Sequence, residues 1–258
     1  MRKTTLRKIA AYSVIAVLIL QSCKDDSSLV TPLPLANTTF SEEFDTAASA
    51  LKRGWKFINA SSPVGGGVWQ DGGDVAAPFF NSYSNNGSNV GFIGASYLST
   101  SAGAGEISNW LVSPSTFMKN GDRIVFYARG WELPGYVAGD TTDFGNRLQL
   151  CLNTFGDGLN VGTGLSDPGD FTTSLVDINP QQYEWHNLPG TYNGVVITAA
   201  KISQAFPSSW TRFEGVVSGI ATPGYYRFAF RYMVMGGGNA GSGSGVGIDK
   251  VSFISVGK

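Results

Sequence analysis

The strongest constraint on the fold of this chain is the recurrence of apolar side chains at every second position in three separate segments. The segments are residues 123–129, 147–153 and 225–234. In the last of them every second side chain from Tyr226 to Val234 is apolar, and two arginines occupy positions between them. A period of two is typical of antiparallel strands with one buried face. The pattern therefore predicts an antiparallel β protein.

The composition supports this fold class and indicates two layers. Of the 258 residues only 14% are charged, whereas 34 are glycine and 12% are aromatic, which suits strands joined by tight turns. Residues 195–205 fit a short helix and a strand about equally well, and no long helical pattern follows residue 38. We therefore predict an all-β, two-sheet antiparallel jelly-roll sandwich. Residues 154–209 depart from the alternation, and we expect long loops with one or two strands there.

The N-terminus has the parts of a secretory signal. Four basic residues precede a mostly apolar run, 9–20, and the sequence Leu20-Gln21-Ser22-Cys23 follows. A helix of this length is about 18 Å long, which is shorter than the roughly 30 Å hydrocarbon core of a membrane. Residues 1–22 are therefore predicted to be a signal peptide and not a transmembrane anchor. The Leu-x-Ser-Cys ending resembles a lipobox, which implies that Cys23 is lipidated and begins a bacterial lipoprotein.

The residues after Cys23 predict a tether and an address. Residues 23–38 contain two prolines and many small polar side chains, as expected of a short flexible tether. The sequence Lys24-Asp25-Asp26 is similar to the acidic tag with which some Gram-negative bacteria send lipoproteins to the outer face of the outer membrane. The resemblance implies an outer-membrane, lipid-anchored protein that faces the cell exterior.

Charge and cysteine content exclude two further features. The formal net charge is −1, and the first 22 residues hold four basic residues and no acidic one, so the rest of the chain is acidic. An acidic chain without a basic run is unsuited to nucleic acid. With Cys23 lipidated only Cys151 remains, so no intramolecular disulfide is expected, and Cys151 is predicted to be a buried thiol.

Nine short motifs occur in order over about residues 39–256. They are FSEEFD at 40–45, GW at 54–55 followed by Trp69, NWLVSP at 109–114, NGDRIVFY at 120–127, RLQL at 147–150, VDINP at 176–180, SWTRF at 209–213, RFAFRY at 227–232 and GIDKVSF at 247–253. Together they resemble the choice-of-anchor J domain, a jelly-roll relative of the cleaved adhesin and MAM domains of secreted bacterial proteins. The resemblance implies one jelly-roll domain at residues 39–258 on the cell surface. It implies no agreed ligand and no catalytic residues.

Four carboxylates near the ends of this domain suggest a structural calcium site. Glu42 and Asp249 are each in phase with apolar neighbours, so both are predicted to be directed into the core, where an unpaired carboxylate is costly. If the first and last strands lie side by side, these two meet, with Glu43 or Asp45 near the rim, and their oxygens suit Ca²⁺. The alternative is that these carboxylates accept N–H groups of turns or pair with an arginine: Arg123, Arg227 or Arg231.

Aromatic residues in the predicted loops form a second candidate site. Flat rings with a polar edge suit sugars, which present both C–H faces and hydroxyls. The residues are Trp131, Tyr136, Tyr183, Trp185, Tyr192 and Trp210. The alternative is that these rings cap the core, which we expect for Trp210 and leave open for Trp131 and Trp185. The tryptophans of the motifs are predicted to pack in the core: Trp55, Trp69 and Trp110.

The sequence offers little support for catalysis. His186 is the single histidine, and no Gly-x-Ser-x-Gly nucleophile motif occurs. The glycine-rich segment 236–247 lacks a lysine and precedes a strand, so it is predicted to be a flexible hairpin loop and not a phosphate loop. We predict a non-enzymatic, adhesin-like surface protein that binds glycan. The alternatives are a protein-binding or structural envelope component, and a glycoside hydrolase with two facing carboxylates about 5–10 Å apart.

Overall fold

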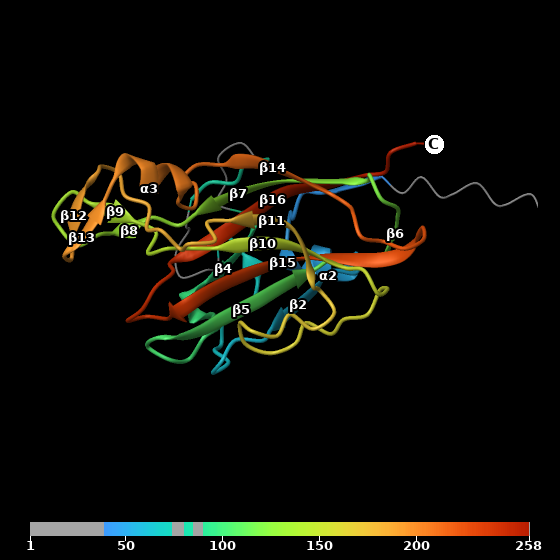
Figure 1. Ribbon diagram of the computed structural model, residues 1–258, viewed down its shortest axis with the longest axis horizontal. Helices are drawn as coiled ribbons and strands as arrows, with labels where there is room; N and C mark the ends of the chain where they lie inside the picture. Colours follow the sequence, from blue (N-terminus) through green and yellow to red (C-terminus); the bar gives the residue numbers. More distant parts are fainter. Residues whose placement is uncertain (1–38, 74–79, 85–89, 258) are drawn as a thin grey trace, which may run out of the picture. The chain divides into compact units, whose positions relative to one another are not determined.

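The computed structural model describes residues 39–73, 80–84 and 90–257, which form two antiparallel sheets packed face to face (Figure 1). The predicted signal peptide at 1–22, the lipidation site Cys23 and the tether to residue 38 lie outside the described residues. Within the described ranges, no helix combines the length and the apolar character that a membrane crossing requires. The predicted all-β sandwich is confirmed.

The first sheet is built around its longest strand, β16. Its strands in spatial order are β14 (Thr211–Val216), β7 (Arg123–Gly130), β16 (Gly245–Ile254), β4 (Ile93–Ser96) and β3 (Gln70–Asp71), and β1 (Phe40–Glu42) also pairs with β16. The first and last described strands are therefore neighbours, as expected, with the Phe40 ring stacked on that of Phe253.

The second sheet is built around β15, the longest strand described. Its strands in spatial order are β11 (Thr173–Ile178), β10 (Leu148–Asn153), β15 (Gly224–Gly237), β5 (Gly105–Val112) and β2 (Lys56–Asn59), and β6 (Thr116–Met118) also pairs with β15. Short helices connect some of the strands: α2 (Ala47–Lys52), η2 (Tyr97–Ser99) and α3 (Ala199–Gln204).

The apolar side chains at the alternating positions form the core between the two sheets. The three alternating segments correspond to β7, β10 and β15, and the apolar parity of β15 from Tyr226 to Val234 is buried throughout. Phe126 of β7 meets Phe230 of β15 edge to face, with ring centroids 4.8 Å apart. One face of each sheet is therefore apolar because the sheets bury these faces against each other.

The two sheets close together along one edge. Gly215 of β14 lies so near β10 that a Cβ there would be 2.7 Å from the Leu150 side chain. A larger residue at 215 would force the edge strands apart, since close-packed side chains cannot yield that much space.

Residues 154–172, here called the covering loop, lie over the outer face of the second sheet. Beneath the loop is a second apolar cluster, to which the loop contributes Val161 and Phe171 and the sheet contributes Trp110. Cys151 belongs to this cluster as well, and burial raises the pKa of its thiol to about 12. The prediction that Cys151 is a buried thiol is confirmed.

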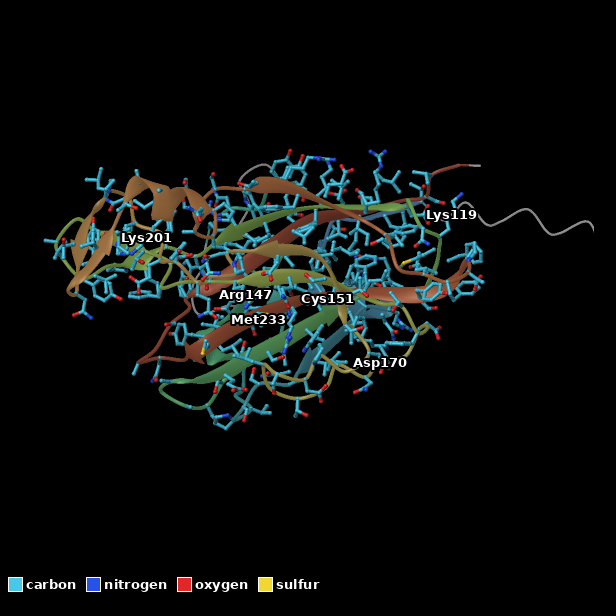
Figure 2. The ribbon with its side chains drawn as sticks, in the orientation of Figure 1. Lys119, Arg147, Cys151, Asp170, Lys201 and Met233 are labelled. Atoms are coloured by element: carbon cyan, nitrogen blue, oxygen red, sulfur yellow. The ribbon has the colours of Figure 1, made fainter. Side chains whose placement is uncertain are left out.

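Residues 131–146 and 179–206, here called the end lobe, extend one end of the sandwich (Figure 1). The lobe contains two short hairpins, β8 (Leu133–Pro134) with β9 (Thr141–Thr142) and β12 (Gly190–Tyr192) with β13 (Val195–Ile197), as well as α3. Residues 195–205 thus hold both a strand and a helix. Figure 2 shows Lys201 of the lobe at one end of the molecule and Lys119, which follows β6, at the other.

The glycine-rich segment does not form the predicted hairpin. Residues 236–244, here called the glycine-rich loop, begin with the last two residues of β15 in the second sheet and lead to β16 in the first, so the strands on either side do not pair with each other. The local sequence indicated a turn between two strands, but the sheet that each strand joins is decided by distant residues. The loop is therefore a crossing between the two layers at the lobe end of the sandwich.

Candidate functional site

The centre of the end lobe is a buried histidine between two carboxylates. His186 Nδ1 lies 2.9 Å from Asp140 Oδ1, and its Nε2 lies 3.2 Å from Glu184 Oε2. The ring of Tyr192 stacks on the imidazole at a centroid distance of 3.9 Å. Because the imidazole is fully buried and both its nitrogens face carboxylates, it holds the lobe together and is not open to a ligand.

This histidine completes a closed ring of hydrogen bonds around Tyr136. The backbone N–H of Tyr136 donates to Asp140 Oδ2 at 3.1 Å, and the Tyr136 hydroxyl donates to Glu184 Oε1 at 2.9 Å. His186 joins the two carboxylates, so Tyr136 is fixed from its backbone and from its hydroxyl. Burial, together with the bond to Glu184, raises the pKa of Tyr136 to about 12, so the phenol remains a donor at neutral pH.

Tyr136 lines a groove between the end lobe and the glycine-rich loop, here called the first hollow. The hollow has a volume of about 490 Å³, within the range of small-molecule sites. Its wall combines rings, amides and a carboxylate: Tyr97, Tyr136, Phe144, Glu184, Asn193 and Asn239, with Leu133 and residues 238–243. Tyr136 is 40% exposed, so a large part of its ring is open to solvent.

The glycine-rich loop forms its side of the first hollow with closely packed backbone. The Gly243 N–H donates to Phe144 O at 2.6 Å, which joins the loop to the lobe, and the Ala240 N–H donates to Gly103 O at 2.9 Å. A Cβ at Gly241 would lie 2.0 Å from the Gly236 carbonyl oxygen. Glycine is required at 241 because the backbone folds back on itself there.

Asp143 is another buried carboxylate of the end lobe, and it binds the lobe's backbone. Asp143 Oδ1 accepts the N–H groups of Gly145 and Trp185 at 2.9 and 2.8 Å, whereas Asp143 Oδ2 has no partner among the described residues. Complete burial raises the pKa of Asp143 to about 7, far above its ordinary value of 3.8. The Asp143 side chain thereby fixes the backbone next to His186.

The structure distributes the aromatic residues of the predicted sugar platform over several places. Tyr136 alone lines the first hollow, while Tyr192 is buried against His186. Tyr183 lines a separate hollow of about 560 Å³ beside α3, and the Trp185 ring is half-buried outside both. Trp131 packs against the cluster around Phe92.

Two of the three tryptophans predicted to pack in the core, Trp55 and Trp69, lie between the sheets, whereas Trp110 is buried on the outer face of its sheet. Trp210 caps the first sheet, as expected, with its ring edge-on to Phe80 and Phe92 and its Nε1 donating to Asn81 O. The remaining tryptophans are fully buried, two in the main core and the third beneath the covering loop: Trp55, Trp69 and Trp110.

The carboxylates of the predicted calcium site have other partners. The burial expected of Glu42 and Asp249 is confirmed, but Glu42 pairs with Arg53 and accepts Trp55 Nε1–H, while Asp249 accepts the N–H groups of Tyr83 and Ser84. These bonds satisfy the buried carboxylates. The expected backbone donors are found for Asp249, but the arginine that pairs with Glu42 is Arg53 and not one of the three that were named.

The other two carboxylates do not complete such a site. Glu43 accepts the Ser41 hydroxyl at the surface, and Asp45 is exposed. No group of three metal-ligating side chains occurs within residues 39–73, 80–84 and 90–257. The described residues therefore do not fit a calcium ion shared by the two chain ends, and calcium stays a prediction.

Sequence reasoning missed most of the first hollow. It did not single out Tyr97, Glu184, Asn193 or Asn239. Only two of these residues have a local feature that could have identified them. Asn193 precedes Gly194 at a hairpin turn with positive φ, and Asn239 lies in the glycine-rich run. Neither feature indicates that the two segments meet, since they come from different layers of the sandwich.

Comparison with protein-family models found no match, and comparison with curated proteins found none either. Among solved structures, the chain is similar to the K3 and K1 cleaved adhesin domains of Lys-gingipain from Porphyromonas gingivalis. The identities are 15% and 16%, the TM-scores 0.48 and 0.46, and 85% of this chain aligns with 100% and 99% of those domains.

A second kind of neighbour is the C-terminal CBM6 of LamC, a marine laminarinase from Zobellia galactanivorans. The identity is 13%, the TM-score is 0.33, and 84% of this chain aligns with all of that domain. Because each TM-score is below 0.5, the sandwich architecture of this chain rests on its own strand pairing, and the ligands of these proteins are not carried over.

Proposed function

We propose that this chain is a lipid-anchored protein of the cell surface that binds glycan in the first hollow. The observation that carries the proposal is the closed ring of hydrogen bonds that holds the exposed Tyr136 ring beside the Glu184 carboxylate. A ring held in place offers a stacking surface for a sugar face at little entropic cost, because it loses no freedom on binding. Amides at Asn193 and Asn239 supply donors and acceptors for hydroxyls.

The same geometry favours binding over hydrolysis. Glu184 is the single carboxylate among the described residues that line the first hollow, and its Oε2 faces His186. Hydrolysis of a glycosidic bond generally needs two carboxylates on either side of it. We therefore propose a non-enzymatic role.

The position of the chain ends is compatible with display from a membrane. The Ser255 N–H donates to Thr39 Oγ1 at 3.1 Å, so the described chain begins close to where it ends. Figure 1 shows the C-terminal end opposite the end lobe. A tether preceding Thr39 would therefore leave the first hollow at the far end of the sandwich, where a ligand outside the cell can reach it.

A glycan-array screen with the chain from residue 24, which contains the whole unit 37–258, tests the binding. We expect the Tyr136→Ala variant to lose about tenfold or more in affinity, since one stacked ring contributes on the order of 1–2 kcal/mol. The matched control is Tyr225→Ala, because Tyr225 is a 60% exposed tyrosine on β15 that does not line the hollow. Equal binding by both variants would remove the first hollow as the site.

The proposed anchor has its own test. In cells grown with an alkyne-tagged fatty acid, the protein should carry the label, and Cys23→Ser should lose the label and release the protein into the soluble fraction. Digestion of intact cells with a protease should degrade the wild-type protein if it faces the exterior. An unlabelled wild-type protein would refute the lipid anchor without affecting the glycan proposal.

Exposed aliphatic side chains on the end lobe favour a protein partner as the second candidate. Four of them are 52–65% exposed: Val137, Leu188, Val195 and Val196. Exposed apolar side chains that lie close together at the surface are typical of protein contacts, and Val195 and Val196 are consecutive residues of β13. A photo-cross-linking residue at position 196 should form a protein adduct on cells if such a partner exists, and Val196→Ser should leave glycan affinity unchanged.

A further inference from the structure

A second hollow lies next to the first, with which it shares lining residues. It has a volume of about 520 Å³ and is lined by the turn at residues 66–67, by Gln70, by Leu98 and by residues 100–102. Tyr97 and Asn239 line both hollows, so the two meet at these side chains. The backbone N–H of Tyr97 donates to Ser244 O at 3.0 Å, which fixes the junction against the end of the glycine-rich loop.

We propose, on the basis of the glycan-binding function above, that the ligand is an uncharged oligosaccharide long enough to lie across both hollows. A ligand confined to one small ring would leave one hollow unused. A chain of several rings places one ring beside Tyr136, crosses Tyr97 and Asn239, and reaches Leu98 and residues 100–102. Contact in both hollows then adds to the affinity without further ordering of the protein.

The charge of the walls selects an uncharged ligand. Neither lysine nor arginine occurs among the described residues that line the two hollows, and Glu184 is their single acidic side chain. A carboxylated or sulfated sugar would lose hydration on binding and would find no cation in the hollows to compensate for the loss. Its negative charge would also be repelled by the nearby Glu184 carboxylate. Hydroxyls, in contrast, find amides at Asn193 and Asn239 and backbone groups along both glycine-rich turns.

Three consecutive glycines shape the second hollow. A Cβ at Gly65 or Gly67 would lie 2.4 or 2.7 Å from backbone atoms at Leu98, because their N–H groups donate to the carbonyls of Ser99 and Leu98. Gly66 between them has no neighbouring atom within 4 Å of an added Cβ. The outer two glycines allow close packing, and the middle one leaves the hollow open.

Gly66 lines the second hollow but not the first, and no atom lies within 4 Å of an added Cβ there, so a large side chain at this position tests the second hollow separately. Calorimetric titration of the chain from residue 24 should use the cello-, xylo- and manno-series from monosaccharide to hexasaccharide, and oligogalacturonates as the acidic counterpart. We expect the affinity for at least one uncharged series to rise about tenfold or more with length and then level off. Gly66→Trp should remove the gain from length while leaving the affinity for the shortest bound member unchanged.

The controls separate this inference from the proposed function. Gly257→Trp adds the same side chain at another glycine with open space, near the C-terminus, and should change nothing. If Gly66→Trp fails to match this control in circular dichroism and melting temperature, the smaller Gly66→Leu replaces it. Tyr136→Ala should weaken short and long oligosaccharides alike.

The possible outcomes are distinct. Affinity that does not depend on length, or a gain from length that survives at Gly66→Trp, would overturn the extended site while leaving glycan binding intact. Oligogalacturonates that bind as tightly as uncharged chains would overturn the charge selection. An absence of binding to every probe, on the array as well as in solution, would overturn both the inference and the proposed function.

Discussion

The covering loop and the end lobe are both long connections outside the two sheets, but different forces hold them. The covering loop buries Val161 and Phe171 against the second sheet and is held there by a buried arginine, Arg231, whose Nη2 donates to Gly164 O at 2.7 Å and to Leu165 O at 2.9 Å. The Arg231 guanidinium also lies over the Trp110 ring, 4.8 Å from its centroid. The loop is therefore an outer layer of the core.

The end lobe directs its polar groups toward one another. Its centre is the His186 cluster, and its surface leaves Tyr136 and several aliphatic side chains exposed. A connection that packs against the sheet stabilises the fold. A connection whose contacts are mostly internal can present a rigid surface to a ligand. Mutations in the covering loop should therefore change stability, and mutations in the end lobe should change ligand binding.

The largest effect is expected in the pH dependence of stability at Asp143. Burial raises its pKa in the folded state to about 7, so between pH 3.8 and 7 the folded state holds a proton that the unfolded state has lost. Stability should therefore fall as pH rises through this window, by at most about 4 kcal/mol at roughly 1.4 kcal/mol per pKa unit. Asp143→Asn should flatten the fall, as measured by urea unfolding from pH 4 to 8. Identical slopes for variant and wild type would show that Asp143 is ionised when folded.

The next effect is expected at the arginine beneath the covering loop. Arg231→Met should lower the free energy of unfolding by about 3 kcal/mol, because it leaves the carbonyls of Gly164 and Leu165 without their donor. Urea unfolding measures the loss, and limited proteolysis should cut within residues 154–172. Arg231→Lys, which keeps the charge but not the planar fork, should recover only part of the loss. Glycan affinity should not change, and a parallel loss of affinity would break the separation between the two regions.

A smaller effect on stability is expected in the end lobe. Tyr136→Phe keeps the ring but removes the hydroxyl that donates to Glu184. Because this side chain is 40% exposed, the free energy of unfolding should change by no more than about 0.5 kcal/mol. Calorimetric titration should nevertheless show several-fold weaker glycan binding, since the ring is no longer fixed. A large loss of stability without a loss of affinity would reverse the roles assigned to the two regions.

The smallest effect is expected from chelation. Excess EDTA should leave the melting temperature unchanged, because Glu42 and Asp249 are already neutralised by Arg53 and by backbone N–H groups. Differential scanning calorimetry with and without added Ca²⁺ measures this. A clear fall in melting temperature on chelation would support a calcium site outside the described contacts.

The strands were the predictable part of the fold. The alternation in segment 225–234 depends on neighbouring residues alone, and it located β15 and the face that β15 directs to the main core. It predicted a half-buried strand, whereas the opposite face, with Ala229 and Arg231, is buried as well. The parity argument likewise predicted that Glu42 and Asp249 are buried, but it could not supply their partners. Arg53 lies eleven residues from Glu42, and Ser84 lies 165 residues from Asp249.

The candidate site was much less predictable. Tyr136 was named from its residue type, but the ring of hydrogen bonds that holds it joins residues 46 and 48 positions apart, Asp140 to His186 and Tyr136 to Glu184. The glycine-rich loop was identified as a loop, yet its crossing between the sheets is what brings it against the lobe. No local sequence pattern indicates that the glycine-rich loop lies against the end lobe.

The antiparallel β class and the core-facing side of the main strands could be derived from the sequence, because both follow from side-chain alternation over a few residues. Only the tertiary structure decided which sheet each strand joins, which rings stay exposed and where two hollows meet at Tyr97 and Asn239. The difference lies in how far apart in the sequence the interacting residues are. Alternation is set by the geometry of neighbouring residues, whereas a binding surface is assembled from segments that only the packing of the two layers brings together.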